Sequence, residues 1–91
     1  MELKLSNEAR SNLREISFYT YLNWGKNQTI KYLSGLNHKL DLIATLPYLG
    51  RVFYYVNGVE LRKSGYEKHL IMYFIHDETI VIYQIKNHRQ Q

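Results

Sequence analysis

The spacing of apolar residues changes at Pro47, the one proline of the chain. Before Pro47, apolar residues recur every three or four positions, which is the period of one face of an α-helix. After it they alternate with other residues or form short continuous runs, as they do in β-strands. The sequence therefore predicts a helical half followed by a sheet half, joined at Leu46-Pro47-Tyr48-Leu49-Gly50-Arg51.

The N-terminal part predicts a short strand and a first helix. Leucines alternate with charged residues over residues 2–5, as in a strand. Ser6 is a suitable helix N-cap because its hydroxyl can accept a hydrogen bond from a free backbone N–H. We expect the helix to run to Trp24 and to end where Gly25 can adopt a positive φ. One face of this helix is marked by Ala9, Leu13 and Ile16.

A second helix is predicted from Lys26 or Asn27 to just before Pro47, which cannot continue a helix. Since only one or two residues separate the two helices, we expect an antiparallel helix hairpin. The predicted buried stripe of the second helix is Ile30, Leu33, Leu36, Leu40 and Ile43.

The sheet half contains three predicted turns, at Asn57-Gly58, at Ser64-Gly65 and at 76–78. Asn-Gly is the strongest of these signals because both residues accept positive φ. The runs 66–75 and 79–85 are apolar on both faces over part of their length, which is typical of central strands. The predicted fold is α+β: a short N-terminal strand, an antiparallel two-helix hairpin covering one sheet face, and an antiparallel meander of about four strands.

Composition limits the chemistry. Ninety-one residues predict one domain, residues 1–91. The chain has no cysteine, its four histidines lack ligand spacing, and it has no glycine-rich phosphate loop, so we expect neither a metal nor a cofactor. No run approaches the roughly 20 apolar residues of a membrane helix, and we expect a soluble cytoplasmic protein that does not bind membranes. A net charge of +4 favours an acidic partner, either nucleic acid or an acidic protein segment.

Several short motifs are informative through their order and spacing. They are Ala9-x-x-x-Leu13-x-x-Ile16, Trp24-Gly25, the spaced Tyr32, Leu36, Leu40 and Ile43, Pro47-x-x-Gly50-Arg51, Leu61-Arg62, and the strands 70–74 and 80–85 followed by Arg89. Together they resemble the ParE branch of the RelE/ParE superfamily of toxins from type II toxin–antitoxin systems. The resemblance covers nearly the whole chain.

This resemblance implies a growth-inhibiting toxin that inhibits DNA gyrase, as in plasmid maintenance, and that a cognate acidic antitoxin neutralises. It also implies a larger toxin–antitoxin complex that binds operator DNA through the antitoxin. The predicted target-binding residues are Arg51, Arg62 and Arg89, with no catalytic residue favoured. The predicted apolar anchors for the antitoxin are Leu22, Trp24 and Tyr48, although Trp24 could instead close the small core.

Two alternatives stay open. The first is a RelE-like, metal-independent endoribonuclease that cuts messenger RNA at the ribosome, with Arg62, His69, Tyr83 and Arg89 supplying the acid, base and cations. The second is a degenerate toxin that only binds its antitoxin and helps to repress their operon. The lack of a convincing acid–base pair favours gyrase inhibition. A further question is whether Tyr54, Tyr55, Tyr66 and Tyr73 form a stacking face for bases or belong to the core.

Overall fold

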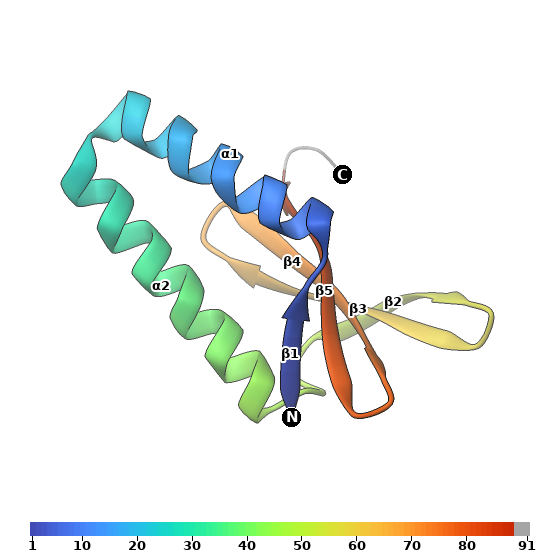
Figure 1. The fold of residues 1–91 in the computed structure, drawn as a ribbon. Coiled ribbons are helices and arrows are strands. Elements are labelled where there is room, and N and C mark those ends of the chain that lie inside the picture. Colours follow the sequence, from blue (N-terminus) through green and yellow to red (C-terminus); the bar gives the residue numbers. More distant parts are fainter. Residues whose placement is uncertain (89–91) are drawn as a thin grey trace.

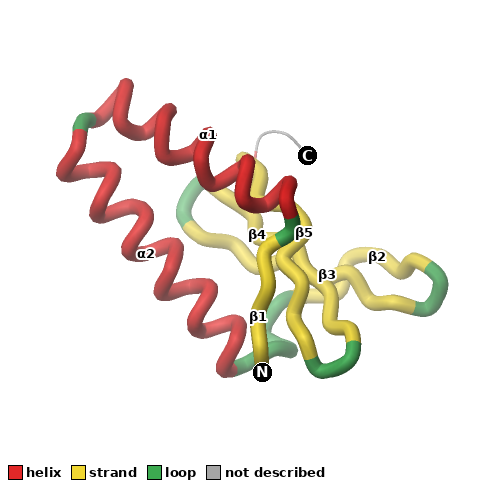
Figure 2. Tube along the Cα trace, viewed as in Figure 1, coloured by secondary structure: helices red, strands yellow, loops and turns green. Residues whose placement is uncertain are grey.

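Five strands form one mixed sheet, and two helices lie over one of its faces (Figures 1 and 2). The computed structural model describes residues 1–88. Its elements are β1 (Glu2–Leu5), α1 (Asn7–Trp24), α2 (Lys26–Thr45), β2 (Arg51–Val56), β3 (Val59–Tyr66), β4 (His69–His76) and β5 (Thr79–Asn87). The strand order is β1-β5-β4-β3-β2. β1 pairs parallel to β5 and the other neighbours are antiparallel, which confirms the predicted α+β fold.

The start of α1 is tied to the closing strand. The Ser6 hydroxyl oxygen accepts a hydrogen bond from the Ala9 N–H at 3.0 Å, as an N-cap does, and donates one to the Tyr83 carbonyl at 3.1 Å. The Asn12 side-chain oxygen accepts from the Ile85 N–H at 2.9 Å. Tyr83 is the extra residue of a β-bulge in β5. The hydrogen bonds of Ser6 to the Tyr83 carbonyl and of Asn12 to the Ile85 N–H therefore hold α1 against the irregular part of that strand.

The helix hairpin turns at a single residue. Gly25 has φ +86° and lies between the end of α1 and the start of α2, so the predicted corner is confirmed. The hairpin tip projects beyond the sheet (Figure 1). For this reason Ile30, predicted to be buried, is 55% exposed, and that part of the prediction is wrong.

The core lies between the helices and one face of the sheet. It is built from Ala9, Ile16, Leu36, Leu40 and Ile43 on the helices and from Ile71, Tyr73, Ile80, Ile82 and Ile85 on β4 and β5. No helix in the described residues is both long enough and apolar enough to span a membrane.

Two of the three predicted turns are confirmed. Asn57 and Gly58 have φ of +51° and +81°, and Asp77 and Glu78 have φ of +49° and +61°. The predicted turn at Ser64-Gly65 is wrong, because both residues continue β3 and pair with Ile71 and Leu70 of β4. The chain turns at Glu67–Lys68 instead, between β3 and β4.

The second face of the sheet carries no helix within residues 1–88. Side chains alternate along a strand, so residues beside the core residues of β4 point away from the helices. We call this the outer face, and the register places on it Arg51, Lys63, Gly65, Leu70, Met72, Phe74 and Lys86. Tyr83 joins them, because its ring lies 6.0 Å from that of Phe74.

Candidate functional site

The turn after α2 is fixed by a buried tyrosine. The Tyr73 hydroxyl accepts a hydrogen bond from the Gly50 N–H at 2.8 Å and donates one to the Pro47 carbonyl at 2.9 Å. Burial raises the pKa of Tyr73, while the Gly50 hydrogen bond and the Arg62 charge act in the opposite direction. A Cβ on Gly50 would lie 2.5 Å from the Tyr73 hydroxyl oxygen, so only glycine fits there. Pro47 and Gly50 thus both form a hydrogen bond with the same hydroxyl, which accounts for the spacing of these two residues in the Pro47-x-x-Gly50 motif.

Arg62 holds the same turn from β3. Its guanidinium donates to the Gly50 carbonyl at 2.8 Å, to the Tyr48 carbonyl at 3.4 Å and to the Glu60 carboxylate at 2.8 Å. It also lies 5.0 Å from the centre of the Tyr48 ring. Only 12% of the Arg62 side chain is exposed. The structure thus places this predicted target-binding residue in a supporting position, whereas the Tyr48 ring that it backs is 66% exposed.

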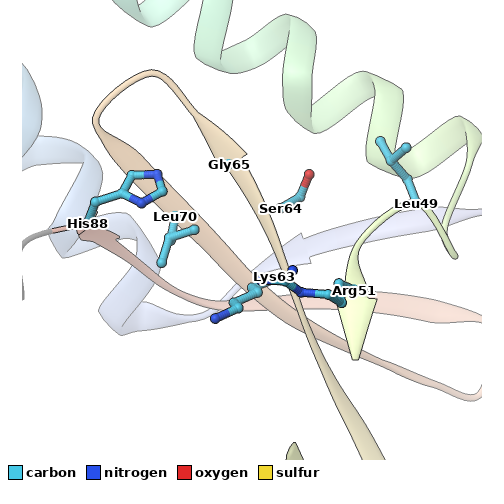
Figure 3. Close-up of a pocket in the computed structure, with 7 residues that line it drawn as sticks. All are labelled: Leu49, Arg51, Lys63, Ser64, Gly65, Leu70 and His88. Atoms are coloured by element: carbon cyan, nitrogen blue, oxygen red, sulfur yellow. The ribbon is translucent and has the colours of Figure 1, made fainter. Parts of the chain in front are cut away.

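Arg51, the second predicted target-binding residue, borders an open hollow of about 390 Å³ (Figure 3). Arg51 begins β2 and pairs with Lys63 of β3, so two cationic side chains start from opposite positions on one face. The hollow is lined by Leu49, Arg51, Lys63, Ser64, Gly65, Leu70 and His88. The third predicted residue, Arg89, lies outside the described residues.

His69 is part of an aromatic contact between α2 and the β3–β4 turn. The Tyr32 hydroxyl oxygen lies 2.6 Å from His69 Nδ1, and the two rings meet edge to face, as do those of Tyr32 and Tyr66. Burial lowers the pKa of His69, and the nearby His88 and Lys68 lower it further. The hydrogen bond between the Tyr32 hydroxyl and His69 Nδ1 makes His69 a structural link to α2.

The residues of the ribonuclease alternative do not form one cluster in the described part of the chain. Arg62 and His69 lie on the helix side of the sheet, since Arg62 pairs with Tyr73 and His69 contacts Tyr32. His69 pairs with Tyr66, four residues along β3 from Arg62, which corresponds to about 13 Å. Tyr83 lies on the outer face, and burial raises its pKa. Three of the four candidates are thus far apart from one another, and the fourth, Arg89, lies outside the described residues.

The predicted antitoxin anchors lie at opposite ends of α2. Leu22 and Trp24 end α1, whereas Tyr48 follows α2, a helix of 20 residues or about 30 Å. Trp24 is 64% exposed, so the alternative that it closes the core is wrong. The Lys68 ammonium lies 6.0 Å from the Trp24 ring. The anchors therefore belong to two separate surfaces.

Each surface contains more exposed apolar residues than the predicted anchors alone. At the hairpin tip, the exposed apolar residues, which we call the tip patch, are Phe18, Tyr19, Tyr21, Leu22, Trp24 and Ile30. At the other end, the edge patch runs from the end of α2 through the turn to edge strand β2, and comprises Leu46, Tyr48, Leu49, Phe53, Tyr54, Tyr55 and Val56. Groups of exposed apolar side chains mark interaction sites on soluble proteins. Within the edge patch, Tyr54 and Tyr55 lie on opposite faces of β2.

The four tyrosines considered for a stacking face are divided. Tyr73 is fully buried and the Tyr66 ring packs on Gly35 of α2, where a Cβ would clash with it. Tyr54 and Tyr55 are exposed on β2. Lys63 was not among the predicted target-binding residues, and Gly65 was predicted to lie in a turn, because their positions in the hollow depend on strand register. Within residues 1–88 no group of three His, Cys, Asp or Glu side chains is placed to hold a metal.

Comparisons with known sequences identify the family, and a comparison with a solved structure matches the fold. The family model described as "ParE toxin of type II toxin-antitoxin system, parDE" matches residues 3–91. The chain is 33% identical over 91 residues to Toxin ParE1 of Mycobacterium tuberculosis strains CDC 1551 and H37Rv, covering 93% of this chain and 87% of each relative. A solved structure, "Chromosomal ParDE TA system from P. aeruginosa", superposes with a TM-score of 0.77 at 17% identity, covering 96% of this chain and 95% of that one.

Proposed function

Because the chain belongs to the ParE toxin family of type II toxin–antitoxin systems, we propose that it inhibits DNA gyrase and that a cognate antitoxin neutralises it. In this proposal the chain acts by binding and not by hydrolysis, in the cytoplasm, where gyrase and its DNA are found. The observation that carries it is the tip patch, a group of large exposed apolar side chains on a domain of 91 residues.

The charge and the patches support an acidic, partly apolar antitoxin. The chain has twelve Lys and Arg against eight Asp and Glu. β2 is an edge strand, and its free backbone groups can accept an added strand from an extended segment. We propose that Leu22 and Trp24 anchor one part of the antitoxin and that Tyr48 anchors another. One antitoxin segment would then have to span the length of α2 to reach both surfaces.

The arrangement of basic residues supports binding over cutting. Metal-independent cleavage of RNA needs an acid and a base on either side of one phosphate. Arg62, His69 and Tyr83 are too dispersed for this, and His69 already contacts Tyr32. We propose instead that Arg51 and Arg89 contact the target directly and that Arg62 supports the Tyr48 ring. The antitoxin would carry the complex to operator DNA.

Tightly controlled expression of the full chain tests the proposal. Supercoiling by purified gyrase is measured with and without the chain, and messenger RNA integrity is followed in the same cells. Inhibited supercoiling with intact RNA is the expected result, and co-expression of the cognate antitoxin should restore growth. Normal supercoiling with cleaved messenger would instead identify the ribonuclease alternative, and harmless expression would identify a degenerate toxin.

A further inference from the structure

The hollow beside Arg51 has an unfavourable charge arrangement. Arg51 and Lys63 are directly opposed across β2 and β3, and like charges in such pairs destabilise a sheet. Lys63 leans toward Phe53, with its ammonium 5.4 Å from the ring centre. No Asp or Glu lines the hollow, and β2–β5 place none on the outer face, in the part of the chain that is described. An anionic ligand would relieve this repulsion.

Gly65 forms part of the hollow's lining, and nothing in the fold requires a glycine there. It lies within β3, where glycine weakens a strand, and its φ is not in the positive range. A Cβ would meet its nearest atom, His88 Nε2, at 3.6 Å, an ordinary contact. Glycine inside a strand often marks a place where a ligand approaches the backbone closely. The missing side chain keeps this part of the lining bare.

We propose that the hollow binds a backbone phosphate of nucleic acid. An arginine guanidinium can hold a phosphate through two parallel hydrogen bonds, and a lysine adds a point charge beside it. Phe53 and Tyr54 lie on the same face as Lys63, where exposed rings can stack on bases. This pairing of cations with aromatic rings favours a nucleic-acid strand over an acidic peptide. The choice of DNA over RNA rests on the proposed function.

The binding test uses fluorescence anisotropy with the full chain and a labelled oligothymidylate of about 12 nucleotides, in about 50 mM salt. Arg51→Ala and Lys63→Ala should each weaken binding about tenfold, the factor of one charge-assisted hydrogen bond. Each should also lower the slope of log K against log salt by about 0.7, as expected for one lost contact to a single strand. The control is Lys31→Ala, which removes an exposed cation from α2 on the other side of the sheet and should leave the affinity within about twofold.

Gly65→Ala separates a built site from diffuse charge attraction. The change keeps the net charge and adds one methyl group to the lining, so it should weaken binding severalfold. Because alanine is favoured over glycine within a strand, the melting temperature should stay the same or rise. A residue with only a structural role would not lower binding while leaving stability intact.

Several outcomes would overturn the inference. The first is that the unchanged chain does not bind the oligonucleotide at low salt. The second is that Lys31→Ala and Lys63→Ala lower the affinity equally. The third is that a glutamate peptide of equal charge displaces the oligonucleotide at equal concentration. Tighter binding of oligouridylate would overturn the choice of DNA. Supercoiling by gyrase is measured separately. Gyrase inhibition without oligonucleotide binding would refute this inference but not the proposed function. Oligonucleotide binding without gyrase inhibition would refute the proposed function but not this inference.

Discussion

Replacing Tyr73 by Phe tests whether one hydroxyl fixes the turn that presents Tyr48 and Arg51. The change keeps the buried ring and removes both hydrogen bonds, to the Gly50 N–H and to the Pro47 carbonyl. Gly50 is buried, so its N–H loses its partner without gaining water, at a cost of about 1–3 kcal/mol. The Pro47 carbonyl is only partly buried and should add less. We expect Tyr73→Phe to lower the free energy of unfolding by about 2–3 kcal/mol.

The measurement is urea unfolding followed by circular dichroism, with thermal melting as a second readout. For a domain of this size the expected loss corresponds to a fall in melting temperature of about 10–20 °C. The matched control is Tyr55→Phe, which removes a hydroxyl from a ring that is 63% exposed on β2 and should change stability by less than about 0.5 kcal/mol. If Tyr73→Phe were as stable as this control, the turn would be held by other contacts and the reasoning would fail.

Arg62 gives this prediction a second test. Its guanidinium donates a hydrogen bond to the Gly50 carbonyl, and the Tyr73 hydroxyl accepts one from the N–H of the same residue. The effects of residues that share a partner are coupled. The double variant should therefore lose less unfolding free energy than the sum of the losses of Arg62→Ala and Tyr73→Phe, by about 0.5 kcal/mol or more. Strict additivity would show that the two side chains stabilise the fold independently.

Four further predictions concern other parts of the molecule. Gly50→Ala should destabilise by more than about 2 kcal/mol in urea unfolding, because its Cβ would clash with the buried Tyr73 ring, whereas Gly65→Ala should not. The pKa of His69 is lowered on folding by burial, so the unfolded state binds the proton more readily; stability should fall as pH drops below about 6.5, and His69→Asn should reduce that loss. Trp24→Ala should weaken antitoxin binding in calorimetry by tenfold or more, as loss of an interface anchor does, with little change in melting temperature. Asn12→Ala should cost about 1–2 kcal/mol by leaving the Ile85 N–H without its partner, and Asn12→Asp, which keeps an acceptor, should cost less.

Features with a local cause could be predicted from the sequence. Ser6 caps a helix through its own hydroxyl, Asn57-Gly58 turns because both residues accept positive φ, and Pro47 ends α2 by its own ring. The order of elements followed from these signals. Periodicity also identified the buried face of α2, but it gives no information on how far the sheet extends beneath that face, which is why the prediction for Ile30 was wrong.

Features that depend on register could not be predicted in the same way. Ser64-Gly65 has the composition of a turn, and only the pairing with Leu70 and Ile71 places it inside β3. The opposition of Arg51 and Lys63 depends on a bulge at Phe53, which the sequence does not signal. The role of Gly50 depends on Tyr73, 23 residues away, although Pro47-x-x-Gly50 was recognised as a pattern.

The parallel pairing of β1 with β5 has a consequence for the order of folding. The three hairpins of β2–β5 close over two-residue turns, whereas Leu5 meets Ile82 only after the chain has closed a loop of more than 70 residues. Contacts so distant in sequence form late because their loop-closure entropy is large. Changes in β1 should therefore alter the unfolding rate more than the folding rate, and changes in the β3–β4 hairpin should do the reverse. The first strand of the chain would then be the last to attach and the first to detach.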